Sequence, residues 1–228
     1  MRKLIITLLP LLLTAISASA QIFVPSDPIG TQATYTTTWK DGKSSTEQLT
    51  LHRVKGNNVW SSVPGGSDEI PISEIVLPDG VYYSMDELRT LVRQKMTGKA
   101  AKLAKVEINC LSGDRFRMLP LQGTPGQTFP DQTLDVKAKV KLLGLLNLHL
   151  TMTMEGDKIL RRETRKTPLG EVSTIVRSYT MVSKTDVKVM GKREEITQWI
   201  IPGRGLFREE KKKGKELSVK ELTDFKRP

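Results

Sequence analysis

Hydrophobic and polar residues alternate along most of the chain after Gln21, and this period of two is typical of β-strands. The alternation starts at Ala33 and Tyr35, and Asp41-Gly42 follows at the position of a two-residue hairpin turn. Similar short stretches, separated by turns rich in Gly, Pro and Asn, continue to the C-terminus, where Lys213-Gly214-Lys215 joins the last two. The pattern predicts a series of antiparallel hairpins.

The longest alternating stretch runs from Leu134 to Met154, with apolar residues at the even positions and mostly polar residues at the odd ones. A straight strand of that length would extend about 65 Å, well beyond the usual strand. Gly144 is therefore expected to mark a bend, a bulge or a tight reversal. The stretch predicts a sharply curved sheet whose concave face is apolar.

The period changes at Ser84, which forms a capping box with Glu87 and predicts the start of a helix. The helix is expected over about residues 85–97, or to 104 if further turns continue it, with an apolar stripe spaced by three and four residues. The stripe comprises Met85, Leu88, Leu91 and Val92. Asp86 and Glu87 are adjacent carboxylates, but helix capping explains both better than an acid and base pair does.

These elements predict a mainly β protein with a single curved antiparallel sheet, a half-barrel or open barrel, and one helix packed on its apolar face. Residues 21–228 show no internal repeat, low-complexity linker or change of composition. One β-rich domain is therefore expected after residue 20.

The first twenty residues have the pattern of a secretory signal peptide. Basic Arg2 and Lys3 precede the apolar run from Leu4 to Leu13, and small residues lead to an expected cleavage after Ala20. A single-pass anchor is the alternative, although the apolar run is short for a membrane span. Cleavage would leave 208 residues of the 228 and lower the net charge from +11 to +9. The mature protein is expected to be periplasmic or secreted and not to span a membrane.

Cys110 is the single cysteine, so no intramolecular disulfide can form. No cysteine follows the small residues of the predicted signal, which indicates that the mature protein carries no lipid anchor.

The sequence contains no recognisable catalytic, metal-binding or cofactor-binding motif. His52 and His149 are the two histidines, and neither lies in a metal-ligand spacing. A Gly-x-Ser-x-Gly elbow is absent, and Gly203-x-Gly205 lacks the third glycine of a dinucleotide site. A carboxylate-based hydrolase remains an alternative if acidic side chains converge at a barrel mouth. The candidates are Glu155, Glu163, Glu194 and Glu195.

Turn and strand markers in the second half of the chain give a family resemblance. They comprise Gly126-Gln127-Thr128-Phe129-Pro130-Asp131, Thr167-Pro168-Leu169-Gly170, Trp199 with Pro202-Gly203-Arg204-Gly205-Leu206 and Glu209, Gly214-Lys215, and Glu221-Leu222. In this order they resemble the TapB-like family of exported bacterial proteins, a domain of unknown function. The resemblance implies a curved antiparallel half-barrel, similar in build to periplasmic lipoprotein carriers, and it implies no site residues.

Two functions of different classes follow. The first is a non-enzymatic binding or scaffold protein of the envelope, whose partner is an anionic envelope lipid, a glycan or another envelope protein. Its candidate anionic-surface contacts are Lys211, Lys212, Lys213 and Lys215. The second is a carrier that holds an apolar ligand in the concavity of the sheet. Its candidate ligand-facing residues are Leu146, Leu148, Leu150, Met152 and Met154. Nucleic acid is not expected as a partner, because the basic clusters lack interleaved aromatic residues.

Overall fold

The computed structural model describes residues 22–65, 68–86, 104–111, 113–141, 145–185 and 192–228. These residues form one antiparallel sheet of thirteen strands. The strands are β1 (Gln32–Trp39), β2 (Ser44–Lys55), β3 (Asn58–Gly65), β4 (Asp68–Leu77), β5 (Gly80–Ser84), β6 (Ala104–Cys110), β7 (Arg115–Pro120), β8 (Gln132–Lys141), β9 (Leu145–Thr167), β10 (Gly170–Thr185), β11 (Lys192–Ile201), β12 (Gly205–Lys213) and β13 (Glu216–Lys226).

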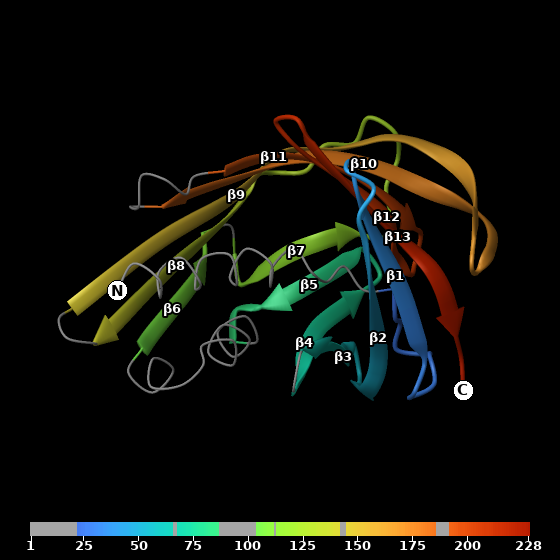
Figure 1. Cartoon of the computed structure of the whole chain (residues 1–228), viewed down its shortest axis with the longest axis horizontal. Coiled ribbons are helices and arrows are strands. Elements are labelled where there is room, and N and C mark those ends of the chain that lie inside the picture. Colours follow the sequence, from blue (N-terminus) through green and yellow to red (C-terminus); the bar gives the residue numbers. More distant parts are fainter. Residues whose placement is uncertain (1–21, 66–67, 87–103, 112, 142–144, 186–191) are drawn as a thin grey trace.

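The order across the sheet is β6-β8-β9-β10-β11-β12-β13-β1-β2-β3-β4-β5-β7. Most neighbours are consecutive hairpins, but β1 pairs with β13 from Gln32↔Lys226 to Trp39↔Ser218, which joins the two ends of the chain within the sheet. The sheet curls into a nearly closed barrel, and Figure 1 shows β10 and β11 arching above β5 and β7. The strand order begins at β6 and ends at β7.

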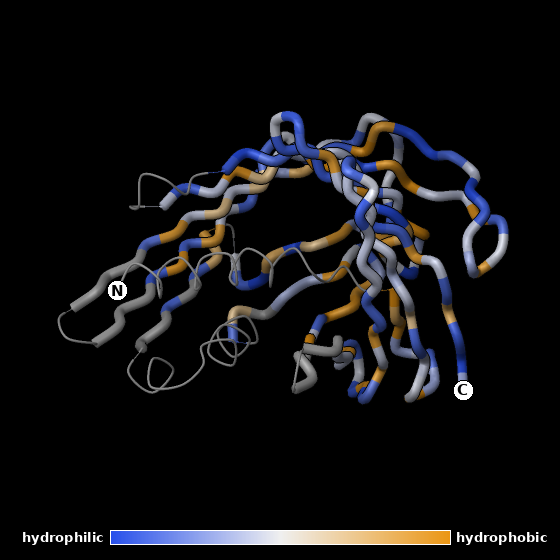
Figure 2. The backbone as a smooth tube through the Cα atoms, in the orientation of Figure 1, coloured by the Kyte–Doolittle hydropathy of each residue, from blue (hydrophilic) through white to orange (hydrophobic). Residues whose placement is uncertain are grey.

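Hydrophobic and polar residues alternate along the strands (Figure 2). The hydrophobic ones form the core of the barrel. Ala33 and Tyr35 of β1 are buried beside Leu49 of β2, while the intervening threonines are more exposed. One connected cluster of buried apolar side chains takes in residues from twelve of the strands, and Cys110 of β6 packs against it. Burial of this cluster supplies the main driving force for the curvature, because closure removes the apolar face of the sheet from water.

The predicted reversal near Gly144 is confirmed by the strand pairing. Lys141 at the end of β8 pairs with Leu145 at the start of β9, and the register continues to Gln132↔Met154. The long alternating stretch is therefore a hairpin and not one curved strand. Residues 142–144 themselves lie outside the described residues.

The predicted fold class is wrong in two respects. The sheet is a nearly closed thirteen-stranded barrel instead of a half-barrel, and no helix packs on its apolar face in the described residues. Met85 and Asp86 alone adopt helical conformation there, and 87–103, where the rest of the helix at about 85–97 or 104 was expected, lie outside the described residues. The physical reason is that a long sheet can curl up and bury its apolar face against itself. The predicted signal segment, 1–20, also lies outside the described residues.

Candidate functional site

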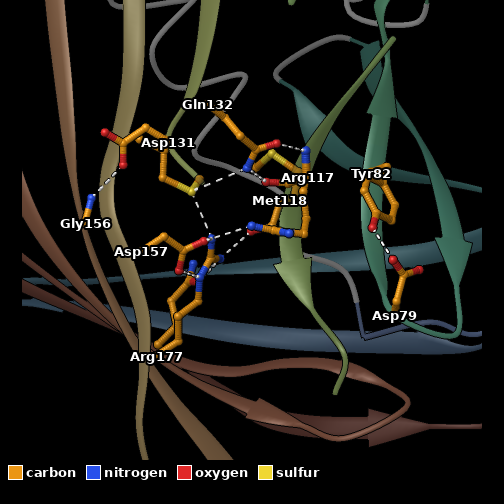
Figure 3. Close-up of polar contacts among 11 residues, drawn as sticks. Asp79, Tyr82, Arg117, Met118, Asp131, Gln132, Gly156, Asp157 and Arg177 are labelled. Carbon is orange, nitrogen blue, oxygen red and sulfur yellow. Dashed lines mark hydrogen bonds and ion pairs between the residues drawn. The ribbon is translucent and has the colours of Figure 1, made fainter. Parts of the chain in front are cut away.

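A seam runs along β7, the end of the strand order, where it faces the start of β8. The side chain of Gln132 spans this seam: the Arg117 amide donates to Gln132 Oε1 at 2.8 Å, and Gln132 Nε2 donates to the Arg117 carbonyl at 3.3 Å (Figure 3). Both groups of the Arg117 backbone are thus bonded as they would be by a neighbouring strand. Gln132 is 7 % exposed. Its side chain therefore replaces part of a β-ladder and closes the barrel.

A buried ion pair lies behind the seam. Arg177 of β10 donates from Nε and Nη2 to the two carboxylate oxygens of Asp157 in β9, at 2.6 and 2.7 Å. Both side chains are fully buried. Arg117 also reaches the Asp157 carboxylate, at 3.3 Å, from the other side (Figure 3). One carboxylate thus joins strands on both sides of the seam.

Every N–H group of the Arg177 guanidinium has an acceptor. Besides the two bonds to Asp157, Nη1 donates to the Met118 carbonyl at 2.7 Å and to Gln198 Oε1 at 3.1 Å, and Nη2 lies 2.9 Å from Met154 Sδ. A guanidinium has five N–H donors, so the cluster satisfies all of them. This is the condition under which a buried charge is tolerated in a protein interior.

The polar network continues across the interior to β12. Gln198 donates from Nε2 to the Glu209 carboxylate at 2.7 Å, and Lys211 contacts the same carboxylate at 3.0 Å. Burial would raise the pKa of Glu209, but the positive charge of Lys211 and the Gln198 hydrogen bond outweigh it and lower that pKa. We call the set Arg117, Gln132, Asp157, Arg177, Gln198 and Glu209 the seam cluster. It links six strands, β7 to β12, through the inside of the barrel.

Where they are described, the predicted ligand-facing side chains are buried against other parts of the protein. Leu150, Met152 and Met154 are 0, 2 and 1 % exposed. The sulfur of Met154 also contacts the Arg177 guanidinium. The side chains of Leu146 and Leu148 lie outside the described residues, although their backbone pairs with β8.

The predicted anionic-surface lysines face acidic neighbours. Lys211 contacts Glu209, Lys212 lies 3.5 Å from Glu195, and Lys213 lies 3.9 Å from Glu216. Lys215 is exposed at the turn between β12 and β13. The structure therefore places three of the four in ion pairs, and whether any of them contacts a partner remains a prediction.

Three of the four carboxylates considered for hydrolysis lie in separate ion pairs, and the fourth, Glu194, is half-buried in β11. Glu155 contacts Arg193 and Glu195 contacts Lys212. Glu163 accepts hydrogen bonds from Trp199 Nε1, Arg161 and Arg165. Within the described ranges, no three His, Cys, Asp or Glu side chains are grouped so that they could hold a metal ion.

The pKa of Glu163 gives a test of its surroundings. Partial burial acts to raise it, but hydrogen bonds from Trp199, Arg161 and Arg165 lower it from 4.5 to about 2. A depressed carboxyl pKa stabilises the folded state above the unfolded pKa, and this contribution is lost as pH falls from about 4.5 to about 2. Glu163→Gln should therefore cost about 1 kcal/mol near neutral pH and almost nothing at the acid end.

Urea denaturation of both proteins at several pH values measures this difference. Glu171→Gln is the matched control, because Glu171 is exposed in the same hairpin and forms no ion pair with any described residue. A cost for Glu163→Gln that stays constant from neutral to acid pH would contradict the assignment.

Two of the open cavities lined by described residues lie on the outside of the barrel. The larger, about 810 Å³, adjoins the seam and is lined by residues that include Asp79, Arg117, Gln127, Phe129 and Arg162. Its charged groups already have partners within the protein. Asp79 accepts a hydrogen bond from the Tyr82 hydroxyl, and burial together with this bond raises the pKa of Tyr82 to about 12. Arg162 donates to the Gly123 carbonyl.

The second cavity, about 750 Å³, lies around the turn between β2 and β3. Its cationic lining residues are Arg53, Lys55 and Arg115, and its aromatic one is Trp60. We call it the hairpin groove.

Sequence reasoning missed both the seam cluster and the hairpin groove. Asp157 stands between the charged residues Glu155 and Lys158, and nothing in the local pattern separates it from surface residues. A weak signal exists at Arg177, which follows the apolar pair Ile175-Val176 and precedes Tyr179.

Comparison with solved structures assigns the fold. A protein from Bacteroides fragilis described as exported, with a YmcC-like fold, aligns at a TM-score of 0.56 and 17% identity, over 92% of this chain and 100% of that chain. A protein from Parabacteroides distasonis described as a lipoprotein aligns at 0.55 and 13%, over 91% and 99%. The chain therefore has the YmcC-like fold found in exported proteins and lipoproteins of uncharacterised function.

No family model and no curated protein matches the sequence. In the described part of the chain, no helix is long and apolar enough to cross a membrane.

Proposed function

We propose that the protein is a non-enzymatic binding protein of the bacterial envelope, exported through its N-terminal signal and cleaved after Ala20. It belongs on this proposal to the TapB-like family and acts in the periplasm or outside the cell. The basic, apolar and small-residue order of residues 1–20 supports export, and the two structural neighbours are themselves described as an exported protein and a lipoprotein.

The position of the cavities relative to the barrel carries the proposal. Among the described residues the barrel interior is filled by apolar side chains and by the seam cluster, and Arg177 is 0 % exposed. Two cavities lined by described residues, of about 810 and 750 Å³, lie outside the barrel. Binding is therefore proposed at the outer surface and not in the concavity.

The state of the acidic groups supports a non-enzymatic role. Glu155, Glu163 and Glu195 each neutralise a nearby cation, and Asp157 is saturated by two arginines. A general acid must be free to exchange a proton with a substrate, whereas these carboxylates are bound to cations of the protein itself. These groups are better explained by stability than by catalysis.

Native mass spectrometry of the purified mature protein tests the proposal. We expect one mass, which corresponds to the chain that begins at Gln21, with no bound lipid, and no saturable binding of a fluorescent fatty-acid analogue. The physical reason is that Leu150, Met152 and Met154 are packed by the protein itself. A lipid bound in a one-to-one complex, or saturable binding of the acyl probe, would show instead that the protein is a carrier.

A further inference from the structure

The hairpin groove is a concave surface lined by three cationic side chains. Arg53 and Lys55 come from β2, and Arg115 comes from β7. The strands that lie between them in the sheet, β3, β4 and β5, bring these distant segments to one face. None of the lining residues is acidic.

The three cations of the groove differ from the paired lysines of β12. Arg53, Lys55 and Arg115 are exposed, and none forms an ion pair with a described residue. By contrast Lys211, Lys212 and Lys213 each face a glutamate. The positive charge of Arg53, Lys55 and Arg115 is therefore available to an external anion.

One of these cations is held in position by an aromatic ring. Arg53 is paired with Trp60 across β2 and β3, and its guanidinium carbon lies 5.0 Å from the centroid of the indole ring. Stacking on a ring restrains a side chain that would otherwise be flexible, and it leaves the edge of the guanidinium free to bind an oxyanion. Less entropy is then lost when an anion binds.

The remaining lining groups suit a sugar. Asn57 and Asn58 place two amides at the turn, and Ile75 and Leu77 of β4 supply half-buried apolar surface. The volume of about 750 Å³ falls within the about 300–1,000 Å³ of ligand clefts. Such a space is larger than one inorganic oxyanion needs.

Features of a membrane-docking surface are missing from the groove. The large apolar side chains that are strongly exposed in the described residues are Ile29, Trp39, Leu111, Leu160 and Leu217, and none of them lines the groove. A recess of cations and amides without a protruding apolar residue favours a chain that can enter it over a flat lipid surface.

We propose that the hairpin groove binds a segment of an acidic polysaccharide, with Arg53 and Arg115 on its carboxylates and the amides of the turn on its hydroxyls. This inference names a ligand class for the proposed function and rests on it. Guanidinium groups form paired, charge-assisted hydrogen bonds with carboxylates, so charge on the sugar is required.

Calorimetric titration with hexagalacturonate tests the proposal, with neutral maltohexaose as the matched sugar. The mature protein should bind the acidic oligosaccharide and not the neutral one. The double variant R53Q/R115Q should bind hexagalacturonate at least about tenfold more weakly. The double variant K212Q/K213Q removes the same charge from the paired lysines and should weaken binding less than about twofold.

If the two double variants weaken hexagalacturonate binding equally, only the net charge of the protein matters. That result would overturn the assignment of the binding site to the hairpin groove. If hexagalacturonate does not bind, the assignment to an acidic glycan is overturned. The same holds if the protein instead binds phosphatidylglycerol vesicles and R53Q/R115Q reduces that binding. These outcomes differ from failure of the proposed function, which is shown by a co-purified lipid or by acyl-probe binding.

Discussion

Replacing Arg177 with methionine should lower the free energy of unfolding by about 3–5 kcal/mol, because it leaves the Asp157 carboxylate charged and largely unpaired in the interior. Both side chains of the pair are fully buried, and the guanidinium bonds two strands besides β9. Equilibrium denaturation in urea of the purified mature protein measures the loss. Its transition midpoint should move with little change of slope.

Two further variants separate this effect from a general loss of arginine. Arg193→Met removes an exposed partner of Glu155, with side chains 66% and 38% exposed, and should cost less than about 1 kcal/mol. The double variant R177M/D157L removes both buried charges and should recover part of the loss. Equal costs for Arg177→Met and Arg193→Met would contradict the role given to the seam cluster.

Gln132→Met should cost about 2 kcal/mol, since it leaves the amide and carbonyl of Arg117 without their partners at a buried seam. Methionine preserves the length of the side chain but cannot replace the two hydrogen bonds. Hydrogen exchange gives the specific measurement: the Arg117 amide should lose protection, while amides in the middle of β10 keep theirs.

Gln48→Met is the matched control for the seam. Gln48 is exposed in β2, and its side chain bonds only Gln32, at 3.3 Å. Its replacement should change stability by less than about 0.5 kcal/mol. Unchanged protection of the Arg117 amide in Gln132→Met would mean that Gln132 does not close the barrel.

Much of the strand framework could be predicted from sequence, because alternation and turn residues act locally. Ala33 and Tyr35 are buried on one face of β1 as their spacing predicts. Gly42 and Gly214 adopt positive φ angles of 82° and 58° at hairpin turns, a conformation that glycine reaches without steric cost.

The seam cluster could not be predicted, because bulges reverse the alternation where it matters. Gly156, with φ of 63°, shifts the buried side of β9 from Met154 to Asp157. A register shift between Val176 and Arg177 buries both of these neighbours. A strict period of two would have placed one residue of each pair in solvent.

Closure and the hairpin groove could not be predicted for a different reason, namely that both depend on strand order. The capping box at Ser84 and the apolar stripe after it are local signals, and they carry no information on whether β5 and β7 cover the apolar face. Arg53 and Arg115 likewise share a groove only because three strands separate β2 from β7 in the sheet.

The central claim is that the barrel interior is closed and that ligand binds outside it. The most direct test is an NMR titration of the mature protein with hexagalacturonate, in which backbone amides and methionine methyl groups are followed together. We predict chemical-shift changes at Arg53 to Trp60 and at Arg115, with the methyl groups of Met152 and Met154 unchanged. Changes concentrated at those two buried methyl groups would contradict the account.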